Sequence, residues 1–99
     1  MITFVRTHTA MPGKLVEVIE IGKELTAIIK QLTGRDITLA TAVGGNGAEI
    51  ARIGRVDNLA AYEEITTKSM ADAKYRAVTQ RLSGLLVPGS LHDQIWRQV

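Results

Sequence analysis

Residues 36–56 read DITLATAVGGNGAEIARIGRV and predict a β-hairpin. The segments 36–43 and 49–56 are rich in β-branched side chains, which favour strands. Between them, Gly44-Gly45-Asn46-Gly47 supplies residues that accept positive φ at low cost, as a tight connection between antiparallel strands requires. These glycines are not expected to cradle a phosphate, because a strand and not a helix follows them.

An amphipathic helix is predicted before the hairpin, over residues 14–32. At 100° per residue, its large aliphatic side chains fall on one half of the helical wheel and most of its charged side chains fall on the other half. Gly34 is a natural C-terminal stop for this helix. A helix with one apolar half is expected to cover one face of a sheet.

A second helical region is predicted after the hairpin, over residues 59–83. Asp57 and Asn58 are candidates for its N-cap. One alternative is a break near Ala71-Asp72, where Asp72 could cap a separate second piece. The sequence leaves open whether this region is one helix or two.

Strands are predicted at both ends of the chain, over residues 2–9 and 91–99, where side chains alternate in polarity. The order β-α-β-β-α-β predicts an α+β, ferredoxin-like domain over residues 1–99, with a four-stranded antiparallel sheet and both helices on one face. The first strand is then central and lies beside the last strand. Because the other face of the sheet stays uncovered, we expect a homodimer formed sheet to sheet.

Composition argues against several classes of protein. The chain has 99 residues, of which 45% are hydrophobic and 22% charged, as in a globular domain. The absence of cysteine removes disulfide and thiolate chemistry and fits a reducing, cytoplasmic location. The net charge of +2 is dispersed along the chain, so no nucleic-acid partner is expected. No apolar run approaches the ~20 residues that span a bilayer, so no membrane partner is expected.

Arg6 and His8 share one face of the predicted central strand. A charge in that position needs a partner, which Glu49 or Asp93 could provide. Burial beside Arg6 should keep His8 neutral at pH 7, and His8 is the best single candidate for a general base or a ligand anchor. The alternative is a histidine that only fills space. His92 is expected nearby, but no third ligand completes a metal site, so no metal is predicted.

One stripe of the second helical region differs from the aliphatic face of the first helix. It contains three hydroxyl-bearing side chains and two alanines at helical spacing, in Leu59, Tyr62, Thr66, Ser69, Met70, Ala73 and Ala77. A pocket between this helix and the sheet would explain the mixture, since small-molecule sites are mostly apolar with a few polar groups. The alternative is that small side chains let the helix approach the sheet closely.

Trp96 is the only tryptophan, and it shares a strand face with His92, Gln94 and Gln98. This face is too polar for a dry core and too aromatic for open solvent, so we expect Trp96 to be buried at a subunit interface or in a pocket wall. The predicted ligand-binding residues are therefore Arg6, His8, Tyr62, Thr66, Ser69 and Trp96.

Three segments resemble the NIPSNAP family. They are RTHTAMPGKL at residues 6–15, DNLAAYE at residues 57–63 and DAKY at residues 72–75. The chain departs from the family pattern at Ala73, where proline is usual, and at His8, where an aromatic residue is common. The resemblance implies a dimeric α/β barrel, in which two sheets pack through their uncovered faces.

The same resemblance places the chain among relatives with several activities. The superfamily also contains antibiotic-biosynthesis monooxygenases, haem-degrading monooxygenases and isomerases, most with a pocket between helices and sheet. No catalytic residue can be carried over from the NIPSNAP pattern. A haem role is not expected, because the haem enzymes place a histidine on a helix whereas His8 and His92 lie in predicted strands, and no other cofactor is predicted.

Two functions are consistent with these observations. The leading hypothesis is a dimeric protein that binds a small apolar or aromatic molecule, with cofactor-independent monooxygenase or isomerase chemistry left open. The alternative hypothesis is a non-catalytic oligomeric or interaction module, which the lack of a recognisable catalytic constellation favours. A cavity lined by Tyr62, Thr66 and Ser69 would support the first hypothesis, and tight packing there would support the second.

Overall fold

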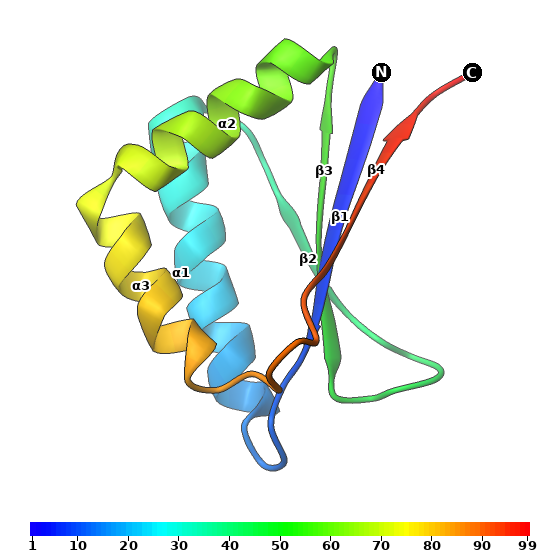
Figure 1. Ribbon diagram of the computed structural model, residues 1–99, viewed down its shortest axis with the longest axis vertical. Helices are drawn as coiled ribbons and strands as arrows, with labels where there is room; N and C mark the ends of the chain where they lie inside the picture. Colours follow the sequence, from blue (N-terminus) through cyan, green and yellow to red (C-terminus); the bar gives the residue numbers. More distant parts are fainter.

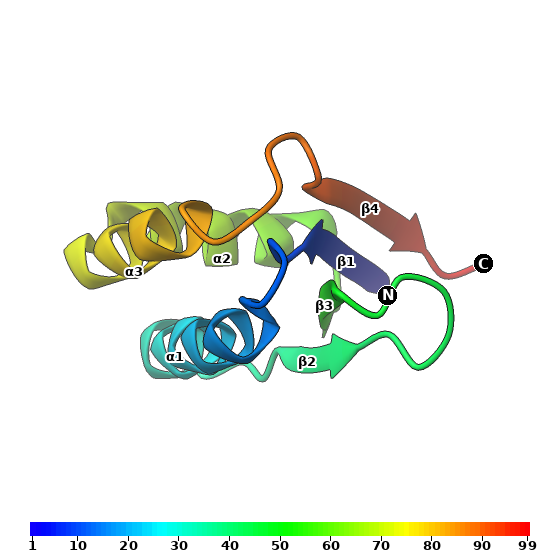
Figure 2. The same cartoon turned by 90° about the horizontal axis from the view of Figure 1, so that it is seen from below.

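The computed structural model describes residues 1–99 as one antiparallel sheet with its helices on one face (Figures 1 and 2). The strands are β1 (Ile2–Thr9), β2 (Thr38–Thr41), β3 (Glu49–Val56) and β4 (His92–Arg97), and the helices are α1 (Leu15–Thr33), α2 (Leu59–Ala71) and α3 (Ala73–Ser83). The strand order is β2-β3-β1-β4. This confirms the ferredoxin-like plan, with β1 central and beside β4.

Helix α1 buries the aliphatic half that its sequence predicts. Val18, Leu25 and Ile29 are buried in the core between this helix and the sheet. At Gly22 the helix comes so near the sheet that an added Cβ would lie 3.1 Å from the Leu39 side chain. Gly34 ends the helix with φ of 74°, and its N–H donates to the Lys30 carbonyl oxygen at 2.8 Å.

The hairpin between β2 and β3 forms as predicted, but β2 is shorter and the connection is wider. Gly45 takes positive φ and Asn46 does not, so the chain does not use a two-residue Asn-Gly turn. The Asn46 side chain instead accepts a hydrogen bond from the Ala48 N–H at 3.0 Å. An asparagine that bonds to the backbone two residues later stabilises such a loop without positive φ.

The second helical region, which the sequence left open as one helix or two, breaks into two helices at Asp72, and α2 and α3 meet at an angle (Figure 1). Asn58 caps α2 by accepting from the Ala61 N–H at 2.9 Å, and Asp72 caps α3 by accepting from the Tyr75 N–H at 2.8 Å. The break also ends the predicted stripe, because Ala73 and Ala77 are exposed and α3 buries Tyr75, Val78 and Leu82 instead.

Strand β4 lies at the edge of the sheet and none of its six side chains is buried. Figure 2 shows all three helices on one side of the sheet, while the opposite side carries no element of the chain. None of these helices combines the length and the hydrophobicity that crossing a membrane requires.

Candidate functional site

A polar row crosses the sheet on the face that the helices cover. Residues directly opposite each other in paired strands share a face. Leu39 of β2 lies opposite Arg52 of β3, Arg52 lies opposite Arg6 of β1, and Arg6 lies opposite Asp93 of β4. The row therefore places two arginines and one aspartate side by side beneath the helices.

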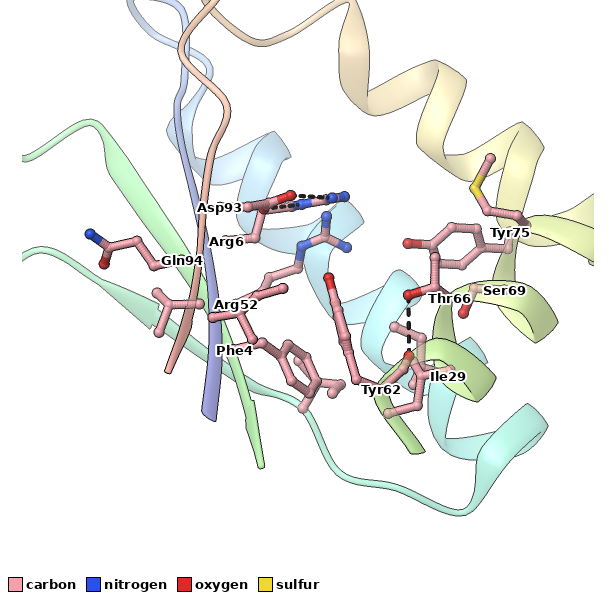
Figure 3. Close-up of a pocket in the computed structure, with 15 residues that line it drawn as sticks. Phe4, Arg6, Ile29, Arg52, Tyr62, Thr66, Ser69, Tyr75, Asp93 and Gln94 are labelled. Carbon is pink, nitrogen blue, oxygen red and sulfur yellow. Dashed lines mark hydrogen bonds and ion pairs between the residues drawn. The ribbon is translucent and has the colours of Figure 1, made fainter. Parts of the chain in front are cut away.

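A cavity of about 140 Å³ lies between this row and α2. Its wall is mostly apolar, with polar side chains from β1, β3, β4 and α2, and is formed by Phe4, Val5, Arg6, Ile29, Ile37, Arg52, Tyr62, Ile65, Thr66, Ser69, Met70, Tyr75, Asp93, Gln94 and Ile95 (Figure 3). Thr66 and Met70 on α2, and the β4 residues, are exposed, so the cavity opens between α2 and β4.

Arg6 and Asp93 neutralise each other at this opening. The Arg6 Nε donates to Asp93 Oδ1 at 2.7 Å, and Arg6 Nη2 donates to Asp93 Oδ2 at 2.8 Å. These two hydrogen bonds lower the pKa of Asp93 and raise the pKa of Arg6. Asp93 is thus the partner that Arg6 requires, and both of its carboxylate oxygens are engaged.

Arg52 has no such partner. Its residue is only 8% exposed, no carboxylate lies within ion-pair distance of it, and its buried Nε has no hydrogen-bond partner. In Figure 3 the Arg52 guanidinium points from β3 toward the helices, as that of Arg6 does from β1. The buried Ser69 hydroxyl on α2 also lacks a partner. Buried polar groups are nearly always satisfied by protein or by ordered water, so these two side chains leave hydrogen-bonding capacity beside the cavity for water or a ligand.

The apolar side of the cavity depends on a glycine in β3. The Phe4 and Tyr62 rings lie with their centroids 4.9 Å apart and tilted by 38°. The Phe4 ring occupies the space above Gly54, where an added Cβ would lie 2.7 Å from Phe4 Cε2 and 2.8 Å from Ile37 Cδ1. Only glycine at position 54 lets the aromatic pair close this end of the cavity.

Four of the predicted ligand-binding residues line the cavity, namely Arg6, Tyr62, Thr66 and Ser69. His8 does not. It lies on the same face as Arg6 but two residues further along β1, opposite Ile50, and only 2% of it is exposed. Neither of its ring nitrogens has a hydrogen-bond partner. Burial, with the positive charges of Arg52 and Arg6, lowers the pKa of His8 to about 4, so the imidazole is neutral at pH 7.

The two histidines do not form a pair. His92 lies opposite Thr7, and its side chain therefore points to the face of the sheet away from His8. They come close along the strands, as the topology predicts, but they cannot bind the same ion. Elsewhere, too, no three His, Asp or Glu side chains converge.

Trp96 also lies outside the cavity. It is opposite Thr3, on the uncovered face of the sheet, and 58% of it is exposed in the single chain. Alternation along β4 places Asp93 and Ile95 toward the helices, which leaves Trp96 on the other face. Trp96 therefore does not lie in the pocket wall. It lies on the uncovered face, where we still expect a subunit interface.

The sequence-based prediction missed Arg52 and Tyr75 as wall residues. Arg52 had a signal, because in β3 it alternates with Ile50, Gly54 and Val56 on a face that is otherwise apolar. A single arginine on a buried strand face points to a partner that is charged or polar. Tyr75 had no such signal, since its position depends on the break at Asp72.

No protein-family model matches this sequence, and no curated protein matches it. Solved structures do share its fold. A NIPSNAP family protein from Agrobacterium tumefaciens str. C58 superposes with a TM-score of 0.83 at 21% identity, over 99% of this chain and 92% of that chain. An uncharacterized NIPSNAP domain protein from Burkholderia xenovorans gives a TM-score of 0.84 at 19% identity, over 100% of this chain and 95% of that one.

The chain has the fold of NIPSNAP family proteins. This confirms, at the level of fold, the resemblance that residues 6–15 and 57–63 suggested. The fold of this chain is also similar to that of an antibiotic biosynthesis monooxygenase, with a TM-score of 0.76 at 13% identity over 100% of this chain and 99% of that chain.

Proposed function

We propose that this protein binds a small, largely apolar molecule in the cavity beneath α2. The observation that carries the proposal is a cavity of about 140 Å³ whose wall includes buried polar groups without partners. An engineered cavity of roughly 150 Å³ holds a benzene molecule, so the space fits a single ring with a polar substituent. Tyr62, Thr66 and Ser69 surround this space, as the ligand-binding hypothesis requires.

The wall residues support a binding function and do not indicate a particular reaction. A nucleophile held by a base would mark a catalytic site, and the serine and threonine of this wall have no histidine beside them in the lining. His8 is neutral but sits outside the wall, so its role as a general base stays a prediction. The non-catalytic module would need α2 packed tightly on the sheet, which the cavity argues against.

Native mass spectrometry of protein purified from its own host tests this function. We expect a retained small molecule in the wild type, and a loss of that molecule in Ser69→Leu, which fills the cavity. Thr67→Leu is the matched control, because Thr67 is an exposed residue of the same helix and does not line the cavity. Retention of the same molecule by Ser69→Leu would contradict binding beneath α2.

We also propose a homodimer that forms through the uncovered face of the sheet. That face carries Val5 and Ile53, which lie opposite each other at its centre, and Trp96 at its edge, because strand alternation turns these residues away from the face that the helices cover. Large apolar side chains on a bare sheet face favour association with a second copy. A stable interface would bury about 1,000 Å² or more in total.

A further inference from the structure

We propose that the ligand of the cavity is a monoanion: a ring-sized carboxylic acid whose carboxylate binds the Arg52 guanidinium. This inference rests on the proposed binding function and adds the chemical class of the ligand. It comes from the charge balance of the polar row, which contains two guanidiniums and only one carboxylate.

Arg52 and Arg6 place two like charges side by side in the sheet. These residues lie directly opposite each other in β3 and β1, and like charges in that position destabilise a sheet. Asp93 offsets one of the two charges, because both of its oxygens accept hydrogen bonds from Arg6. The row therefore keeps one positive charge, and that charge belongs to Arg52.

Arg52 is also buried, so its charge needs a partner. A buried guanidinium is stable only when its charge and its N–H groups find partners. Asp93 is the only acidic residue in the cavity wall, and it is already engaged with Arg6. Arg52 instead lines the cavity, and in this proposal the partner that its charge requires is a ligand bound there.

The remaining wall defines the rest of that ligand. A carboxylate fits the planar fork of arginine with two parallel hydrogen bonds. The unpartnered Ser69 hydroxyl gives a further donor in the same cavity. The rings of Phe4 and Tyr62, with Ile65, form an apolar wall that matches a ring or a branched chain of similar size. Benzoate has this combination of one ring and one carboxylate.

Calorimetric titration with two probes of the same shape tests the inference. Benzoate carries the carboxylate, and benzamide replaces it with a neutral amide. We expect the wild type to bind benzoate roughly 10- to 100-fold more tightly than benzamide, because a hydrogen bond to a charged group adds about that much affinity. Benzylamine, which carries a positive charge, should not bind.

Variants of β3 assign the preference to Arg52. Arg52→Met removes the charge and relieves its repulsion with Arg6, so it should fold, lose the tenfold or greater preference for benzoate and keep its benzamide affinity. Arg52→Lys should keep part of the preference. Arg55→Met is the matched control, because Arg55 lies on the same strand but is exposed on the other face, and it should bind as the wild type does.

The outcomes separate this inference from the proposed function. Equal affinity of the wild type for benzoate and benzamide would leave a binding site in place and overturn the anion preference. If neither benzoate nor benzamide binds, the ring-sized site is overturned as well. A benzoate preference that survives in Arg52→Met but disappears in Arg6→Met would show that Arg52 is not the recognising residue.

Discussion

His8 is a buried imidazole surrounded by positive charge, and this makes stability depend on pH. Burial, and then the positive charges of Arg52 and Arg6, disfavour its protonation more than Asp93 favours it, so the pKa falls from 6.5 to about 4. In the unfolded chain the imidazole takes up a proton below about pH 6.5, whereas the folded protein does so only near pH 4. The neutral His8 imidazole therefore makes its full contribution to the free energy of unfolding at pH 7, and this contribution decreases as the pH falls from 6.5 toward 4.

We predict that His8→Phe removes this loss of stability at low pH. The wild type should lose up to about 3 kcal/mol of unfolding free energy between pH 6.5 and pH 4 through His8, and the variant should lose correspondingly less. Urea unfolding at a series of pH values and one protein concentration measures the difference. His92→Phe, at an exposed position of β4, is the control and should keep the wild-type slope. Parallel curves for the wild type and His8→Phe would contradict the lowered pKa.

At the scale of single residues, the candidate site could be predicted from the sequence only in part. Arg6, Tyr62, Thr66 and Ser69 follow from strand alternation and helical spacing, which depend on neighbours close in sequence. Whether His8 and Trp96 reach the cavity depends on register and on how far each helix extends over the sheet. Those quantities are set by packing between distant segments, so sequence periodicity could not determine them.

At the scale of the elements, the sequence predicted all four strands, and it left open whether the second helical region is one helix or two. The bounds of β1 and β3 agree with the prediction, because strict alternation and flanking turn residues mark their ends. Strand β2 is four residues long where eight were expected. Pairing with β3 limits β2, and the Asn46 hydrogen bond takes the chain out of the sheet earlier than its β-branched residues suggest.

The contact of β3 with β1 at Gly54 gives a prediction about packing. Gly54→Ala places a methyl group in the volume of the Phe4 ring, so we expect a loss of about 1–3 kcal/mol of stability and a ring displaced into the cavity. Thermal unfolding and benzoate titration measure the two effects. Gly47→Ala is the control, since nothing lies within 4 Å of that Cβ. Phe4→Leu should restore stability to the Gly54→Ala variant, and a fully stable single variant would contradict this account.

At the scale of the whole molecule, the uncovered sheet face makes the oligomeric state the main prediction. Ile53→Asp places a charge at the centre of that face, and we expect it to convert a dimer into a monomer at micromolar concentration in sedimentation velocity. Val16→Asp, an exposed change on α1, should leave the dimer intact. The Trp96 fluorescence maximum should move to longer wavelength as the dimer separates. A wild-type monomer, or a fully hydrated Trp96 emission in the wild type, would contradict the sheet-to-sheet dimer.

The position of β4 at the edge has a consequence for the energetics of ligand entry. β4 is paired on one side only and buries no side chain, so we expect its backbone hydrogen bonds to open more readily than those between the two central strands. Separation of β4 from β1 would also withdraw Asp93 from Arg6, because that ion pair joins the two strands. The opened state then presents two unneutralised guanidiniums to an incoming carboxylate, and closure returns Asp93 to Arg6. Opening of the edge strand would thus increase the attraction of the site for an anion.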